Sequence, residues 1–103
     1  MIGRDVNVWV ATTPVDMRKS FDTLAAVVEK FLGHDPQSGS LFVFRNKGGH
    51  LVKVLWWDQQ GWAIYYKRLE EGVFYFPDDG TTAVTITREA LLELLSGKPV
   101  ARR

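Results

Sequence analysis

Hydrophobic and polar residues along the chain follow two repeating patterns, and each pattern predicts one kind of element. Apolar residues between Met17 and Leu32 recur at helical spacing, which predicts a long amphipathic helix. Short runs rich in β-branched and aromatic residues, bounded by turn-forming residues, predict strands. These runs span residues 6–12, 40–45, 50–57, 62–69, 73–76 and 82–86.

Local signals predict where the helices begin and end. Thr13 as N-cap, Pro14 at the first helical position and Asp16 three residues after the cap resemble a capping box. We therefore place the start of the long helix there. Gly33 suits the left-handed position just after its end. Residues 87–96, which begin with a threonine cap, predict a second, short helix.

The predicted order of elements is β-α-β-β-β-β-β-α, with short turns between most consecutive strands. This order favours an α+β fold with a mostly antiparallel sheet of about five to six strands. The long N-terminal helix is expected to pack on one face of the sheet, and the short C-terminal helix to follow the last strand. No linker or repeat is recognisable, which predicts a single α+β domain over residues 1–103 with a loose tail over 97–103.

Turn sequences set the register of the central strands. The motif NKGG places Phe44 opposite Lys53, whether its loop holds two or four residues. The motif DQQG is typical of a type I turn and pairs Trp57 with Trp62. Because side chains alternate along a strand, this register separates two faces of the sheet. The first face collects Leu41, Val43, Val52, Val54, Trp56, Ala63, Tyr65 and Leu69, and the second face collects Phe42, Phe44, Lys53, Leu55, Trp57, Trp62, Ile64, Tyr66 and Arg68.

The first face is expected to form the core beneath the long helix, with Trp56 and Tyr65 buried. The second face is mixed, because it carries Lys53 and Arg68 among its aromatic residues. Two interpretations are open for it. Either the short C-terminal helix or a second copy of the chain covers it, or it is a partly exposed platform on which unpaired bases stack.

Composition and motif content exclude several classes of function. The 103 residues carry a net charge of +1 and no cysteine, which argues against disulfides, thiolate metal sites and a globally basic nucleic-acid binder. No apolar run approaches the ~18 residues of a membrane span, and no secretory signal is recognisable, so we expect a cytoplasmic protein. His34 and His50 are expected in solvated loops. We predict no metal, no cofactor and no catalytic residues.

Basic residues close to the aromatic run are the best candidates for contact with a partner. Arg18 and Lys19 fall in the predicted first turns of the long helix, where cations oppose the helix dipole. The full set of predicted nucleic-acid or partner-binding residues is Arg18, Lys19, Arg45, Lys53, Trp57, Trp62, Tyr66, Lys67 and Arg68. The aromatic members would stack or pack, and the basic members would contact phosphate or an acidic protein surface.

Four motifs give the chain a family resemblance that extends from about Val8 to Leu95. They are Pro14-x-Asp16-x-Arg18-Lys19-x-Phe21-Asp22, Phe42-Val43-Phe44, Lys53-x-x-Trp56-Trp57-Asp58 and Tyr66-Lys67-Arg68-Leu69-Glu70-x-Gly72. In these motifs the chain resembles the accessory proteins of IS66 insertion sequences, called TnpB or the second open-reading-frame product. They are unrelated to the RNA-guided nucleases that share the name TnpB. The family usually has glycine where this chain has Ser20 and Thr23.

The resemblance implies an accessory role in transposition, within a mobile element that also encodes a transposase. We expect the protein to bind DNA or the transposase, or another protein of the element, through the second, aromatic and basic face of the sheet. A non-catalytic protein is expected, because the chain lacks the length and the acidic triad of a strand-transfer enzyme. Two other interpretations stay open: a structural homodimer or interaction module, and a small ribonuclease of the toxin type.

Overall fold

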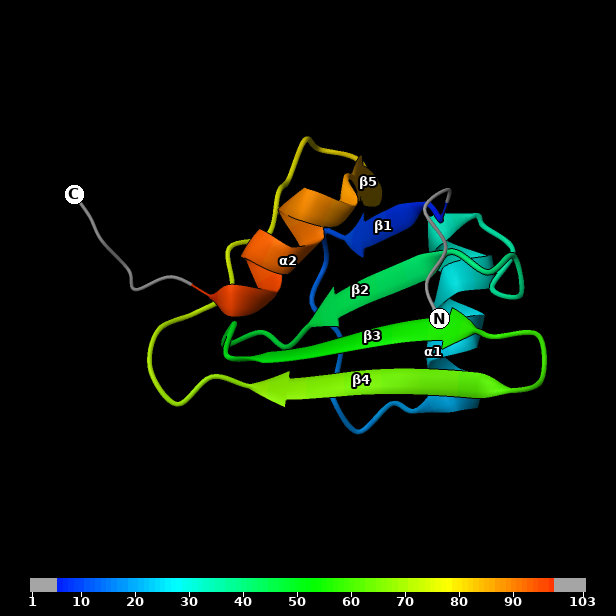
Figure 1. Ribbon diagram of the computed structural model, residues 1–103, viewed down its shortest axis with the longest axis horizontal. Coiled ribbons are helices and arrows are strands. Elements are labelled where there is room, and N and C mark those ends of the chain that lie inside the picture. The colour runs from blue at the N-terminus through cyan, green and yellow to red at the C-terminus, as the bar shows by residue number, and fades with distance from the viewer. Residues whose placement is uncertain (1–5, 98–103) are drawn as a thin grey trace.

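The computed structural model describes residues 6–97, which contain a five-stranded sheet and two helices (Figure 1). The strands are β1 (Val8–Ala11), β2 (Leu41–Arg45), β3 (Leu51–Trp57), β4 (Trp62–Arg68) and β5 (Ala83–Ile86). The helices are α1 (Phe21–Val27), continued by the short π-helical segment η1 (Val28–Leu32), and α2 (Arg88–Ser96). The α+β class is confirmed. The expected tail lies outside the described residues except for Gly97, which ends α2.

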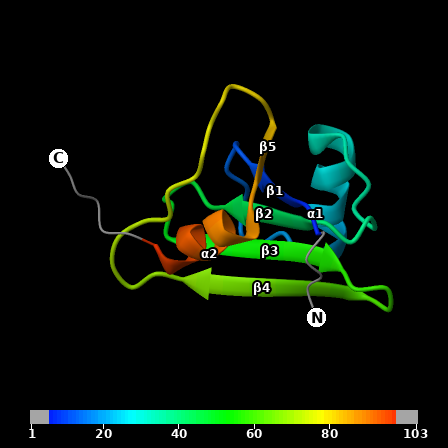
Figure 2. The ribbon, with the colours of Figure 1, turned by 45° about the horizontal axis from the view of Figure 1, so that its top comes forward.

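The strands lie in the order β4-β3-β2-β1-β5, and their pairing is mixed. β1 runs parallel to β2, whereas the other neighbouring pairs are antiparallel. Parallel neighbours require a crossover connection, and α1 with η1 supplies it between β1 and β2. Figure 2 shows β4 along one border of the sheet, with β3 and β2 following it.

The predicted register of β2, β3 and β4 is confirmed. Phe44 pairs with Lys53 across β2 and β3, and Trp57 pairs with Trp62 across β3 and β4. The number of residues in each turn determines which side chains share a face. A register shift of one residue would move each side chain to the opposite face, so the correct turn lengths were sufficient to separate the two faces.

The two turns that join these strands have particular forms. The β2–β3 loop is the four-residue form, closed by the Asn46 N–H, which donates to the Leu51 carbonyl over 3.1 Å. The β3–β4 turn is not type I as expected, because Gln59 at its second position has a φ of 81°. The Asp58 carboxylate stabilises this turn by accepting the Gly61 N–H over 3.0 Å.

The expected placement of the helices is wrong, because each helix covers the face assigned to the other. Leu91 and Leu94 of α2 pack in the core of the first face, and Leu24 and Val28 pack in the core of the second face. Figure 1 shows the two helices on opposite sides of the sheet. Both faces are apolar enough to be covered. Which one α1 covers is fixed by the right-handed crossover that parallel β1 and β2 require, and consecutive turns along the chain do not reveal that pairing.

The long N-terminal helix is shorter than predicted, because α1 begins at Phe21 and residues 12–20 form a loop. The N-cap is Ser20, whose N–H donates to the Thr23 hydroxyl over 2.8 Å. Asp16 does not cap a helix, since its carboxylate accepts the Arg18 N–H instead. The predicted C-terminal end is confirmed, with Gly33 in the left-handed conformation at φ 72°.

Two further expectations for the sheet are wrong. Residues 73–76 form no strand; Phe74 instead donates its N–H to the Gly49 carbonyl and buries its ring in the core of the first face. The sheet therefore has five strands rather than the six of the predicted order. Tyr65 is 45% exposed, because it lies on the border strand, although Trp56 packs against the core as expected.

Candidate functional site

The second face of the sheet is largely an interior surface. Phe42, Phe44 and Leu55 have no exposed area, because α1 packs on them through Leu24 and η1 packs on them through Val28. From the sequence we expected the short C-terminal helix or a second copy of the chain to cover this face. In the structure the N-terminal helix covers it instead. A continuous stacking platform is therefore absent from the centre of this face.

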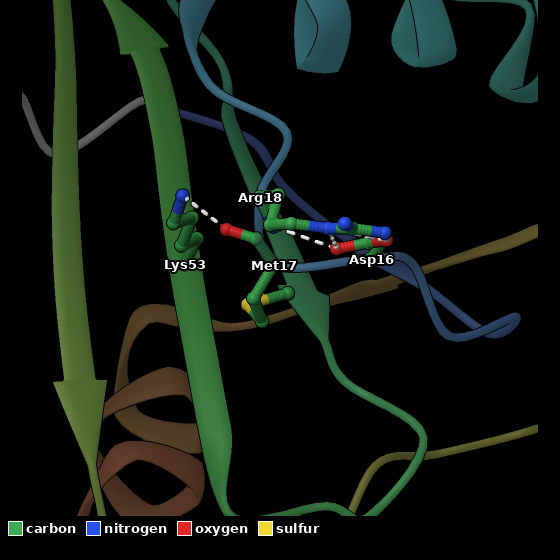
Figure 3. Close-up of polar contacts among 4 residues, drawn as sticks. All are labelled: Asp16, Met17, Arg18 and Lys53. Atoms are coloured by element: carbon green, nitrogen blue, oxygen red, sulfur yellow. Dashed lines mark hydrogen bonds and ion pairs between the residues drawn. The ribbon is translucent and has the colours of Figure 1, made fainter.

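Lys53 was expected to contact a phosphate or a partner, but its side chain is buried in the fold. It is 7% exposed, and its ammonium donates to the Met17 carbonyl over 2.7 Å and to the Lys19 carbonyl over 2.6 Å. The same ammonium lies 4.8 Å from the centre of the Tyr66 ring, a cation–π distance. Figure 3 shows Lys53 reaching from β3 to the loop of residues 12–20. Lys53 thus holds this loop against the sheet.

The loop presents Arg18 to solvent in a fixed geometry. The Arg18 backbone N–H donates to Asp16 Oδ1 over 2.8 Å, and its Nη2 donates to Asp16 Oδ2 over 2.6 Å. Arg18 Nε lies 3.1 Å from both carboxylate oxygens. The Arg18 side chain is nevertheless 92% exposed. Figure 3 places this Asp16–Arg18 pair on the side of the loop that faces away from Lys53.

The pair keeps both charges over a wide pH range. The hydrogen bond from the Arg18 side chain, with help from the Arg18 backbone N–H, lowers the pKa of Asp16 to about 2. The same hydrogen bond raises the pKa of Arg18. The Nη1 nitrogen of Arg18 makes no hydrogen bond within residues 6–97, so its two N–H groups are available to a ligand.

Two surface hollows flank the loop. One lies between the loop and the β2–β3 hairpin and is lined in part by Met17, Lys47 and Leu51. The other lies between the loop and η1 and is lined in part by Lys19 and Phe31. Phe31 was expected on the buried face of the long helix, but its side chain is 71% exposed. Asp16, the partner of Arg18, lines both hollows, so the ion pair lies between two largely apolar recesses.

Arg45 and Lys67, two other predicted binding residues, act inside the fold on the first face. Arg45 Nη2 donates to the Thr12 carbonyl over 3.0 Å, and its guanidinium lies 5.5 Å from the centre of the Phe76 ring. Its buried Nε has no partner within residues 6–97. Lys67 Nζ donates to the Leu95 carbonyl over 2.7 Å and so caps the last turn of α2.

The remaining candidates lie along the β3–β4 hairpin. Trp57 and Trp62 form an edge-to-face pair beside the turn, with ring centres 5.0 Å apart. Near the other end of β4, Arg68 forms an exposed ion pair with Glu70, with Nε 2.9 Å from Oε2. Tyr66 lies between them along the strand and is 52% exposed.

The nine predicted residues consequently do not form one site. The structure gathers Arg18, Lys19, Lys53 and Tyr66 around the loop, of which Lys53 is internal. Sequence reasoning missed Asp16, which it assigned to a helix cap. The signal for its actual role was the Asp-x-Arg spacing, at which an aspartate can bond the backbone two residues on. It also placed His34 in solvent, whereas the His34 ring packs on Trp9 at 3.9 Å between centres.

Residues 6–97 contain neither a cluster of possible metal ligands nor a membrane-spanning helix. No three His, Cys, Asp or Glu residues within 6–97 lie together as metal ligands would. No helix in this range has the length and apolarity to cross a bilayer.

The structure is that of a small α+β protein whose loop of residues 12–20 holds an exposed Asp16–Arg18 ion pair in place. Comparison with known sequences gives its family. The chain belongs to the family described as "IS66 Orf2 like protein", which matches residues 6–103. It is 44% identical to the uncharacterized protein y4hO of Sinorhizobium fredii, over 92% of this chain and 83% of the relative. It is 37% identical to the uncharacterized protein y4jC of the same organism, over 99% and 96%. No solved structure matches the chain significantly.

Proposed function

We propose that the chain is a non-catalytic accessory protein in the transposition of an IS66-type insertion sequence, and that it binds another protein of the element. The transposase is the first candidate partner. Family membership supports the setting in a mobile element. The proposed contact surface is the loop of residues 12–20 with its two flanking hollows.

One observation carries this proposal: a side chain that is 92% exposed is held by an ordered network of hydrogen bonds. An exposed ion pair contributes little to folding stability. Here the loop beneath the pair is in addition held by a buried lysine. Preorganisation of a polar group lowers the entropy lost on binding, which is a benefit for recognition rather than for folding.

The charges favour a protein partner over DNA. Binding to a polyanion gains affinity from unpaired cations that displace counterions. In this chain Arg18 is neutralised by Asp16, Arg68 is neutralised by Glu70, and Lys53 is buried. A fixed guanidinium beside apolar recesses resembles instead the mixture of polar anchors and apolar pockets found at protein interfaces.

A binding assay with the purified transposase tests the proposal. We expect Arg18→Ala to weaken the complex by about tenfold or more, as loss of a charged hydrogen-bonding group does at an interface. Arg88→Ala is the matched control, because Arg88 is exposed at the start of α2, on the other face of the sheet. The proposal fails if the wild-type protein binds no protein of the element, or if both variants bind as the wild type does.

DNA is the second candidate partner, and Lys19 and Lys47 favour it, because they line the two hollows and form no ion pair within residues 6–97. Titration of element-end DNA, single-stranded and duplex, at two salt concentrations decides between the two. Binding whose affinity falls steeply with salt, and falls further in Arg18→Ala, would replace the protein partner by DNA.

A further inference from the structure

The border strand β4 has the properties of a strand prepared to pair with another strand. It ends the sheet, contains seven residues, and carries neither proline nor glycine. Its register with β3 is unbroken from Trp62 to Arg68, so no bulge bends it away from an incoming chain. Natural border strands are usually shortened, bulged or charged because they invite pairing. Figure 2 shows β4 along the free border of the sheet.

The hydrogen-bond pattern shows which backbone groups of β4 are free. Asp58 N–H donates to the Gly61 carbonyl at one end, and Leu69 N–H donates to the His50 carbonyl at the other. Bonded and non-bonded pairs alternate in an antiparallel ladder, so the odd-numbered residues 63, 65 and 67 bond to β3. The N–H and C=O groups that point outward are those of Trp62, Ile64, Tyr66 and Arg68. No group within residues 6–97 bonds to them.

The two cations of β4 that could keep another strand from pairing lie at one end of the strand, and both already bind other groups of the chain. Lys67 is turned to the first face, where it caps α2 through the Leu95 carbonyl. Arg68 is paired with Glu70. The middle of the strand instead exposes aromatic surface on both faces, with Tyr65 45% and Tyr66 52% exposed.

We infer that β4 pairs with β4 of a second copy of the chain, antiparallel and centred on Tyr65, to join two sheets into one. This register pairs all four outward residues, Trp62 with Arg68 of the copy and Ile64 with Tyr66 of the copy. Each such pair makes two backbone hydrogen bonds. A shift by two residues in either direction would leave one outward residue of each strand without its partner.

The side chains of β4 also favour an antiparallel pairing centred on Tyr65. Trp62 lies opposite the Arg68 of the copy on the second face, where a guanidinium can stack on the indole. Tyr65 lies opposite itself on the first face. The strand has a cationic end at Lys67 and Arg68 and no acidic residue. Antiparallel pairing keeps the Arg68 residues of the two copies about 20 Å apart and the Lys67 residues about 13 Å apart, whereas parallel pairing would align like charges.

The absence of cysteine from the sequence makes the register directly measurable. Tyr65→Cys places two thiols opposite each other in a non-bonded pair, where Cβ atoms approach to about 4.5–5.5 Å, close enough for a bridge after a small shift. We expect it to form a disulfide-linked dimer under mild oxidation. Ala63→Cys is the matched control, because residue 63 lies opposite Lys67 of the copy and should not link to itself.

A charge exchange at the same position tests the pairing without covalent chemistry. We expect the wild-type mass, measured by sedimentation equilibrium, to rise with concentration from 11.7 kDa toward twice that value. Tyr65→Lys and Tyr65→Glu should each raise the dissociation constant about tenfold or more, and an equimolar mixture should restore the dimer. Circular dichroism establishes that each variant is folded.

Three results would overturn the inference. One is a wild-type protein that stays monomeric at every concentration. Another is a dimer that both Tyr65 variants leave intact. The third is preferential linkage through Ala63→Cys, which would reject the register. Protection of the outward amides of β4 by the transposase, in a chain that is otherwise monomeric, would assign the border to a foreign strand instead. The Tyr65 side chain lies on the first face of β4 and the loop packs on the second face, so the Tyr65 variants leave the Arg18→Ala test unaffected.

Discussion

Lys53 shows why a cation on a strand can be misinterpreted as a surface residue. Its neighbours in the sequence are apolar, and its face carries aromatic side chains, a combination that also suits a nucleic-acid platform. The structure satisfies its ammonium with two loop carbonyls and an aromatic ring. A charged group buried with full hydrogen bonding orders the segment that supplies its acceptors. Sequence cannot distinguish these cases, because the acceptors are backbone atoms that any residue carries.

We expect Lys53→Met to lower the free energy of unfolding by about 1–3 kcal/mol, because the carbonyls of Met17 and Lys19 lose their donor. Urea denaturation followed by tryptophan fluorescence measures this change. Lys30→Met is the control, since Lys30 is exposed on η1, and its effect should stay within about 0.5 kcal/mol. Equal effects of the two substitutions would contradict the role assigned to Lys53.

The Asp16–Arg18 pair is expected to depend on pH. Its pKa in the folded chain is about 2, below the ordinary value of 3.8. The contribution of the Asp16–Arg18 pair is therefore complete above about pH 4 and is lost as the pH falls through about 2. In NMR spectra, the Arg18 Nε–H signal should titrate with a midpoint near pH 2 and stay constant from pH 4 to 7. Asp16→Asn should abolish this transition, and a midpoint near 4 would show that the pair does not form.

At the scale of elements, strands were easier to predict than the start of the first helix. Alternation and turn parity located β2, β3 and β4 and their register, because both signals are local. The motif TPVD has the composition of a helix start, yet Asp16 serves the turn that holds Arg18. Ser20 and Thr23 supply the contact at the actual helix start. The motif TPVD could therefore begin a helix or form a turn. Tertiary contacts of the loop with Lys53 and Arg45 stabilise the turn.

The caps of the two helices provide a test of this point. Thr87 Oγ1 accepts the Ala90 N–H over 3.0 Å at the start of α2, so Thr87→Ala should cost about 1 kcal/mol of stability. Thr13→Ala should change stability by less than about 0.5 kcal/mol, because Thr13 is exposed and caps no helix. Thermal unfolding of both variants under identical conditions measures the difference. A larger cost for Thr13→Ala would show that the loop depends on a contact of this threonine.

For the whole molecule, the consequence of the helix placement is a sheet buried on both faces. The sequence indicated one core, because the first face was recognised by its uniform apolarity and the second was set aside for its cations. In the structure each face has its own core, one with α2 and one with α1. The two cores share the strands between them, and this predicts that they unfold together.

We expect Leu24→Ala to destabilise the chain by about 2–5 kcal/mol, because Leu24 is fully buried in the core of the second face. Leu92→Ala should have little effect, since Leu92 is 67% exposed on α2. Unfolding curves from fluorescence and from far-ultraviolet circular dichroism should coincide for both variants, as a single cooperative transition requires. Separate transitions would show that the two faces are independent.

The position of β1 between two strands that are distant in sequence has a consequence for how the chain folds. β1 lies between β2 and β5, and the Thr12 hydroxyl at its end bonds the Thr81 carbonyl, 69 residues away along the chain. Contacts between distant segments slow folding, because a long loop must close before they form. During synthesis, β2 to β4 can form a meander early, while one side of β1 stays unpaired until β5 leaves the ribosome. The last step of folding is therefore the addition of β5 to the exposed edge of β1, and until then the nascent chain carries an open strand edge that the finished protein covers.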